Sequence, residues 1–341
     1  MKITTALERL RLLDQRLYWQ EPRLDQVNLT PDVLLQLNAF WPHLKFPPEN
    51  STLSLKLAFA RLDALDELIS GNKWPKMRLW FESHLKKRHF DRLPDSLSSM
   101  GGSHSNHLVA FAAACRFLNI CSHCYVRANG QGDELLSTPT IECLRSLDAG
   151  IIPVSRSRFR LLRQQQHPLF LPEGGKSQEA VQSVASWTEF HAHWLLNFNQ
   201  IFNGCGTGTW LAGLILGLTK KKWSGECLGI PAVAGEAWLK QDIDNLLQAN
   251  GYSDIRLNAD WALDWSYPGR GFKPVSSKLI ETLVRVFQIS VDPVYMPRIL
   301  HAVMKRWCNG ELKENVLVIH GGGLQAAGSM SKAPLCLDVA D

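Results

Sequence analysis

Helix-like and strand-like segments alternate through the first half of this chain, and that alternation limits its possible folds more than any other feature. The helix-like segments are Lys76–Lys87, Asn106–Leu118 and Thr138–Leu147, and the strand-like segments between them are Ser96–Met100, Ser122–Ala128 and Ile151–Ser155. Such an alternation predicts βαβ units on a parallel sheet. We therefore expect an α/β fold.

Size and charge narrow the class of protein. With 341 residues, 45% of them hydrophobic, the chain can bury a large core, and its length favours two domains. The 37 basic and 32 acidic residues give a net charge of +5. The basic clusters are scattered and lack interleaved stacking aromatics, so we expect solvated loops and helix ends and no nucleic-acid surface.

The cysteines and the apolar runs indicate the cellular compartment of the protein and whether it enters a membrane. Eight cysteines in a chain of this size favour a reduced, cytoplasmic protein over a disulfide framework. Cys121 and Cys124 have the spacing of a metal or redox half-site, but no second pair matches them, so we expect strand or buried thiols and no metal. The longest apolar run, Trp210–Leu218, is too short for a bilayer, and we expect neither a signal peptide nor a membrane helix.

Two short stretches carry candidate chemistry. Ile69–Lys76, with the sequence ISGNKWPK, places Lys73 among turn-forming residues, where an amine can be held at the mouth of a pocket. Gly101–Asn106 forms a turn between a predicted strand and a predicted helix. Backbone N–H groups at such a turn, with the Ser105 hydroxyl and the Asn106 amide, can bind an anion.

A third stretch is a glycine–threonine turn that leads into an apolar helix. It comprises Gly206, Thr207, Gly208 and Thr209. Glycines let a phosphate approach the backbone, threonines add hydroxyl donors, and a helix N-terminus supplies a favourable field. A phosphate cradle and a tight turn capped by threonine both fit these residues. The turn is neither a dinucleotide fingerprint nor a nucleotide P-loop, because it has neither Gly-x-Gly-x-x-Gly nor Gly-Lys-Ser/Thr.

Together these stretches resemble one enzyme family. SGNKWPK and GGSHSNH are similar to signatures of the pyridoxal-phosphate enzymes that include 1-aminocyclopropane-1-carboxylate (ACC) deaminase and D-cysteine desulfhydrase, within the tryptophan-synthase-β-like group. Further matches in the same order are the PEGG turn at 172–175, a Gly-rich loop at 267–273, DPVY at 292–295 and the closing strand at 316–323. The resemblance spans roughly residues 57 to 323.

The resemblance implies a role for each matched residue. Lys73 would hold the cofactor, pyridoxal 5'-phosphate, as a Schiff base, and Gly206, Thr207, Gly208 and Thr209 would bind its phosphate. Asn106 would contact the ring hydroxyl, and Ser105 would face the substrate carboxylate. Tyr295 would lie near the cofactor, where a phenol can stack, hydrogen-bond or transfer a proton, although a core or surface tyrosine is the alternative.

The resemblance also implies an architecture. We expect a two-domain, three-layer αβα fold of type II, with a larger domain at 1–76 and 169–341 and a smaller inserted domain at 77–168. Residues Met1–Asn50 should pack on the outside of the larger domain, and Arg156–Gln166 should be a surface excursion. The expected assembly is a homodimer acting on a small amino acid, without a nucleic acid or a membrane as partner.

Two departures from the family leave the substrate open. Met296 follows DPVY, where the family commonly has Glu or Thr, and Gly321 stands where Thr or Leu is usual. Both positions lie near the pyridine nitrogen in the family, so the group that tunes the cofactor is not identified. The implied activity is deamination or β-elimination that releases ammonia and a 2-keto acid. Another lyase or racemase on the same fold, or a cofactor-binding homologue without turnover, remains an alternative.

Overall fold

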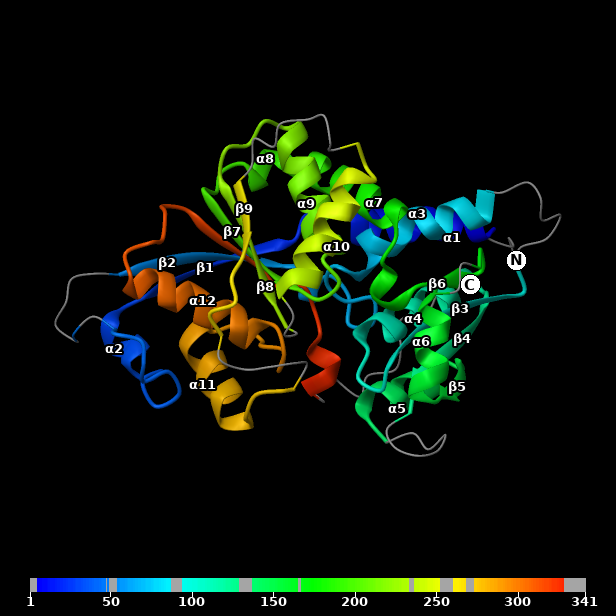
Figure 1. The fold of residues 1–341 in the computed structure, drawn as a ribbon, viewed down its shortest axis with the longest axis horizontal. Coiled ribbons are helices and arrows are strands. Elements are labelled where there is room, and N and C mark those ends of the chain that lie inside the picture. The colour runs from blue at the N-terminus through cyan, green and yellow to red at the C-terminus, as the bar shows by residue number, and fades with distance from the viewer. Residues whose placement is uncertain are drawn as a thin grey trace.

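The chain folds around two β-sheets, one of six strands and one of four (Figure 1). The structure is a computed structural model, and it describes residues 5–46, 48, 54–86, 94–128, 137–164, 167–232, 236–251, 260–267 and 273–327. The expected α/β class is confirmed. Most of the predicted Gly-rich loop at 267–273 lies outside the described residues.

The larger sheet combines strands from both halves of the chain. Its order is β1 (Arg23–Leu29), β2 (Leu55–Arg61), β10 (Val316–Ile319), β7 (Gln200–Cys205), β8 (Glu226–Pro231) and β9 (Asp260–Leu263). Every pairing is parallel except that of β1 with β2. The segment 1–50 therefore supplies the edge strand β1 of this sheet. The expectation that it only packs on the outside of the larger domain did not include this strand.

Both faces of the larger sheet are buried. Neighbouring residues of one strand join different hydrophobic clusters, as Ile201 and Phe202 do on β7. Such a strand is covered by helices on both sides. On one side lie α7 (Gln178–Phe190), α9 (Thr209–Lys220) and α10 (Glu236–Gln248); on the other lie α11 (Ser277–Phe287) and α12 (Met296–Cys308) (Figure 1).

The smaller sheet is fully parallel, in the order β5 (Gly150–Val154), β4 (Cys121–Arg127), β3 (Ser96–Gly102) and β6 (Phe170–Leu171). The segments α4 (Asn106–Leu118) and α5 (Pro139–Ser146) form as the alternation predicts. Cys121 and Cys124 both lie on β4, as the strand-thiol interpretation expects. The expected domain boundaries at 76 and 168 stay predictions.

The expected surface excursion at 156–166 is wrong in part, because Arg156–Gln164 forms the helix α6. Phe159 and Leu162 are buried one helical turn apart, while the four arginines of the segment are exposed. This spacing produces an amphipathic helix. The high charge of the segment hid the spacing of its two apolar residues.

Several further helices and turns lie among the described residues. They are α1 (Ala6–Leu13), a π-helical turn (Asp14–Tyr18), α2 (Pro31–Leu35), α3 (Lys73–Lys86), α8 (Ala192–Leu195) and three 3-10 turns, Leu62–Ala64, Glu173–Gly175 and η4 (Leu324–Ala327). One hydrophobic cluster contains residues of both sheets and of α3, so the core is continuous between them. None of the described helices has both the length and the apolar content needed to cross a membrane.

Candidate active site

The predicted site residues gather where the parallel strands end. Lys73 follows β2, the Gly206–Thr209 turn follows β7, and Gly321–Gly323 follow β10. Ser105 and Asn106 follow β3 of the smaller sheet. In open α/β sheets, ligands bind outside the carboxyl ends of the strands, so this is the expected edge for a site.

Lys73 is the first residue of α3, and its turn ends at Asn72. The prediction that the helix starts at Lys76 is therefore wrong by one turn. The Lys73 ammonium donates to Asn72 Oδ1 at 2.8 Å and to the Gly321 carbonyl at 3.3 Å. Burial lowers the pKa of Lys73 from 10.5 to about 8, against the opposing effect of the Asp292 carboxylate. A lysine with a depressed pKa is a competent nucleophile and base.

A close contact between two backbone segments fixes the position of Lys73. Gly71 has φ +68°, and a Cβ placed on it would lie 2.0 Å from the Gly321 carbonyl oxygen. Only glycine allows the two segments to approach so closely. The Asn72 N–H donates to that same carbonyl at 3.3 Å. The turn before Lys73 is thereby joined to the glycines that follow β10.

The Gly206–Thr209 turn has the form that a phosphate cradle requires. Gly208 is the N-cap of α9, with φ +77°, and no side-chain hydrogen bond caps this 12-residue helix. The hydroxyls of Thr207 and Thr209 lie 3.0 Å apart. The turn therefore offers helix N–H groups, a favourable dipole and two hydroxyls to one anion.

A second buried amine, that of Lys76, lies beside this turn and is not among the predicted site residues. Lys76 is 7% exposed and donates to the Gly174 carbonyl at 3.0 Å. A Cβ placed on Gly174 would lie 2.8 Å from the Thr207 methyl carbon, so the PEGG turn bridges Lys76 and the cradle. Burial lowers the pKa of Lys76 well below its usual value, and the neighbouring Lys73 lowers it further. The signal in the sequence was its position one helical turn after Lys73.

Ser105 and Asn106 begin α4. Ser105 is the N-cap, and its Oγ accepts from the Leu108 N–H at 3.3 Å, which leaves the hydroxyl proton to donate elsewhere. Asn106 Oδ1 accepts from Gln325 Nε2. The Asn106 Nδ2 end of the amide lies against Gly323, where a Cβ would be 2.7 Å away.

Tyr295 faces the end of β7. A Cβ on Gly206 would lie 2.9 Å from the Tyr295 hydroxyl oxygen, and burial raises the pKa of that phenol. The buried Asp292 carboxylate accepts from the Tyr295 N–H at 2.6 Å and the Met296 N–H at 2.9 Å, and it thereby anchors the start of α12. Met296 itself is 1% exposed within the apolar cluster that includes α11 and α12, so its side chain belongs to the core.

These contacts bring the predicted residues together. Gly321 joins Lys73 to the end of β10, Gly323 contacts the Asn106 amide and lies beside Asp292, and Asp292 and Tyr295 reach the end of β7. Within the described residues, no three His, Cys, Asp or Glu side chains gather as metal ligands would. The set therefore offers amines, hydroxyls and backbone N–H groups, which suit an anionic organic ligand.

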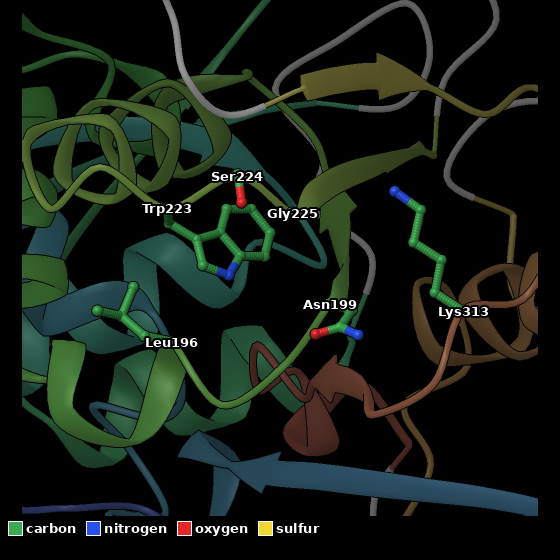
Figure 2. A pocket seen from close by; sticks show the side chains of 6 residues that line it. All are labelled: Leu196, Asn199, Trp223, Ser224, Gly225 and Lys313. Carbon is green, nitrogen blue, oxygen red and sulfur yellow. The ribbon is translucent and has the colours of Figure 1, made fainter.

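A separate hollow lies at the other end of the strands of the larger sheet, away from the predicted site (Figure 2). Its volume is about 340 Å³, and it is lined by Leu196, Asn199, Trp223, Ser224, Gly225 and Lys313. Asn199, Gly225 and Lys313 precede β7, β8 and β10, so the hollow is at the amino ends of these strands. It contains none of the predicted site residues.

Several known proteins are similar to this chain in sequence. No family model matches it. A Pyrococcus abyssi protein provisionally named 1-aminocyclopropane-1-carboxylate deaminase is 24% identical over 279 residues, which cover 75% of this chain and 81% of that protein. The bifunctional D-cysteine desulfhydrase/1-aminocyclopropane-1-carboxylate deaminase of Arabidopsis thaliana, a mitochondrial protein, is 22% identical over 75% of this chain and 69% of its own length. This chain is a distant relative of the ACC deaminase and D-cysteine desulfhydrase family.

Solved structures agree with that relationship at the level of the fold. The crystal structure of an ACC deaminase homologue matches with a TM-score of 0.70 at 19% identity, over 96% of this chain and 97% of that one. Maize serine racemase matches with a TM-score of 0.56 at 13% identity, over 94% of each chain. The tryptophan-synthase-β-like fold expected from the motifs is confirmed.

The site residues fit pyridoxal 5'-phosphate, the cofactor used in this fold type. Two neighbouring amines, Lys73 and Lys76, are costly to bury without an anion, and Gly174 links Lys76 to the turn before the uncapped α9. A phosphate between Lys76 and the start of α9 would compensate their charge. Lys73 would remain available for the aldehyde, and Asn106 for the ring.

Proposed function

We propose that this protein is a pyridoxal-phosphate-dependent deaminase or lyase that acts on a small amino acid and releases ammonia and a 2-keto acid. The observation that carries the proposal is the pair of neighbouring amines, in which Lys73 has a depressed pKa and Lys76 is linked through Gly174 to the turn before the uncapped α9. Lys73 would hold the cofactor, and Gly206, Thr207, Gly208, Thr209 and Lys76 would bind its phosphate. The bound cofactor would supply an electron sink for a bond broken at the substrate's α-carbon.

The chain's own groups would orient the substrate and move protons. The Ser105 hydroxyl and the N–H groups at the start of α4 would bind the substrate carboxylate. The neutral Lys73 amine would accept and return a proton at the α-carbon, which its low pKa favours at neutral pH. Tyr295, kept protonated by its raised pKa, would donate a hydrogen bond near the cradle.

An absorbance spectrum tests this proposal. Purified protein with pyridoxal phosphate should absorb above roughly 400 nm, and Lys73→Ala should lose that band on dialysis. Addition of D-cysteine or ACC should then release a keto acid and ammonia, with sulfide from D-cysteine. Absence of the band in the wild-type protein, or its persistence in Lys73→Ala, would contradict the proposal.

A cofactor-binding homologue without turnover is the second candidate, and Met296 favours it. Its side chain lies in the apolar core, where the family commonly has a polar residue after DPVY. A spectrum typical of the bound cofactor, with no product from D-cysteine, ACC or a panel of small D- and L-amino acids, would select this candidate. Inversion of an amino acid without ammonia release would instead indicate a racemase.

We further propose a cytoplasmic homodimer. Seven cysteines among the described residues are free thiols, which is typical of proteins in reducing compartments. The dimer is carried over from the resemblance. Light scattering of the purified protein measures its mass directly.

A further inference from the structure

Gln325 connects the two halves of the candidate site. It lies in η4, two residues beyond the glycines that follow β10 of the larger sheet, and η4 packs against α5 beside the smaller sheet. The side chain is 2% exposed. Its Nε2 donates to Oδ1 of Asn106, the first residue of α4. A buried glutamine from one sheet's connection therefore holds the amide of a residue that follows a strand of the other sheet.

The hydrogen bond determines which end of the Asn106 amide is left for a ligand. An amide has an acceptor end and a donor end, and Gln325 occupies the acceptor end. The donor end, Nδ2, lies over Gly323, the position where a side chain would collide with it. No described residue accepts a hydrogen bond from Nδ2 in the contacts of this site. Asn106 therefore keeps its N–H groups available for a ligand.

The contact differs from a purely structural amide pair. Two facing amides can exchange two reciprocal hydrogen bonds, in which each donates to the other's oxygen. Here only one bond forms, and the buried Oε1 of Gln325 has no partner among the described residues. An unpaired buried acceptor is costly, so a stability role alone does not account for this arrangement. The cost is explained if Asn106 must keep its donor end for another molecule.

We propose that Gln325 is a positioning residue that fixes the Asn106 amide with its N–H groups toward the ring hydroxyl oxygen of pyridoxal phosphate. This inference rests on the proposed function. None of the recognised motifs contains Gln325. Its proposed role is to orient the Asn106 amide, which donates the hydrogen bond to the ring oxygen. Substitution of Gln325 should therefore alter the cofactor's affinity and its spectrum while Lys73 and the cradle stay intact.

Two substitutions of nearly equal length separate positioning from packing. In Gln325→Glu, the carboxylate only accepts hydrogen bonds, so Asn106 must turn its donor end toward Glu and its oxygen toward the ligand. We expect about tenfold weaker binding of pyridoxal phosphate, measured by fluorescence titration, and a shifted absorbance maximum. In Gln325→Met, the Asn106 amide is released but not reversed, and about threefold weaker binding is expected. Gln36→Glu, on an exposed residue, controls for the added charge.

Substitution of Gln325 in the Asn106→Ala variant tests whether Gln325 affects cofactor binding through Asn106. If Gln325 acts through Asn106, Gln325→Met should have no further effect on affinity or spectrum once Asn106 is alanine. Circular dichroism of each variant confirms that it is folded. If wild type binds the cofactor and both Gln325 variants bind it with the same affinity and spectrum, the inference is wrong and the proposed function survives. If wild type binds no pyridoxal phosphate, the proposed function is wrong, and this inference with it.

Discussion

At the scale of residues, the site is dominated by two amines that the fold removes from water. Burial lowers the pKa of both Lys73 and Lys76, and the neighbouring Lys73 lowers the pKa of Lys76 further. Asp292 is the acidic group whose charge acts on Lys73 in the opposite direction. A pocket with this charge balance favours an anionic ligand. The prediction that follows concerns the amine itself and needs no cofactor.

Lys73 in the cofactor-free protein should react with amine reagents at an unusually low pH. The neutral amine is the reactive form, and with a pKa of about 8 instead of 10.5 its neutral fraction at pH 7 is roughly 300-fold larger. Acetylation rates measured by mass spectrometry should rise with pH and level off above about pH 8 at Lys73. Exposed Lys240 is the comparison, and its rate should still be rising there. A Lys73 profile that parallels Lys240 would disprove the assignment.

The lowered pKa of Lys73 also determines whether its contribution to folding stability rises or falls with pH. The folded-state pKa of Lys73 lies below the unfolded-state value, so the unfolded chain binds more protons between about pH 8 and 10.5. The contribution of Lys73 therefore favours folding increasingly as pH rises through that window. Below pH 8 both states are protonated, and the cost of the buried charge is constant.

Ser105 provides a prediction for the substrate side of the site. Ser105→Ala should retain the cofactor spectrum, because Lys73 and the cradle are unchanged. Turnover should fall about a hundredfold if a transition-state hydrogen bond worth about 2.7 kcal/mol is lost.

The Ser105 hydroxyl also caps α4, so Ser105→Ala should in addition lower the stability of the protein, by about 1 kcal/mol for a lost cap. Ser276→Ala, which removes the equivalent cap from α11, is the matched control. Full turnover in Ser105→Ala would exclude the assigned role.

At the scale of elements, the site consists of three helix N-termini: Lys73 starts α3, Asn106 starts α4 and Thr209 starts α9. Each helix presents its positive end and its unsatisfied N–H groups toward the carboxyl edge of the sheets. The Ser105 hydroxyl caps α4, whereas no side-chain hydrogen bond caps α9. We therefore expect a ligand at the start of α9 to be bound largely by backbone N–H groups.

Thr207 and Thr209 test the cradle. Each single substitution, Thr207→Ala or Thr209→Ala, should weaken cofactor binding by about 1 to 3 kcal/mol, because one hydrogen bond to a charged group is lost. The two hydroxyls lie within hydrogen-bonding distance of each other, so we expect the double variant to depart from additivity. Equilibrium dialysis with pyridoxal phosphate measures these changes, and Thr282→Ala on α11 is the control. Unchanged affinity in the double variant would assign the turn a structural role only.

The sequence predicted elements better than it predicted contacts. The strand, turn and helix around Ser105 were predictable because small and apolar residues follow a glycine turn. The helix α6 was not, because its arginines obscured Phe159 and Leu162. Lys76 and Gln325 were missed as site residues for a different reason: their role depends on neighbours far away in sequence, Gly174 and Asn106 respectively. Apart from the position of Lys76 one helical turn after Lys73, no local pattern in the sequence contains such information.

At the scale of the whole molecule, the site belongs to neither sheet alone. The cradle, Lys73 and Gln325 follow strands of the six-stranded sheet, whereas Ser105 and Asn106 follow β3 of the four-stranded sheet. The two regions share one hydrophobic core. A ligand that contacts both should therefore change the stability of both.

Hydrogen exchange tests this joint contribution. Addition of pyridoxal phosphate should slow amide exchange at the start of α9 and also at the start of α4, because a ligand bound to the folded state stabilises the segments it contacts. Peptides from the distant hollow around Trp223 should change little, because that region lies at the opposite edge of the larger sheet. The non-phosphorylated aldehyde pyridoxal is a control that should protect α9 less. Protection of α9 without protection of α4 would show that Asn106 does not reach the cofactor, and the roles given to Asn106 and Gln325 would then be wrong while the cradle remained supported.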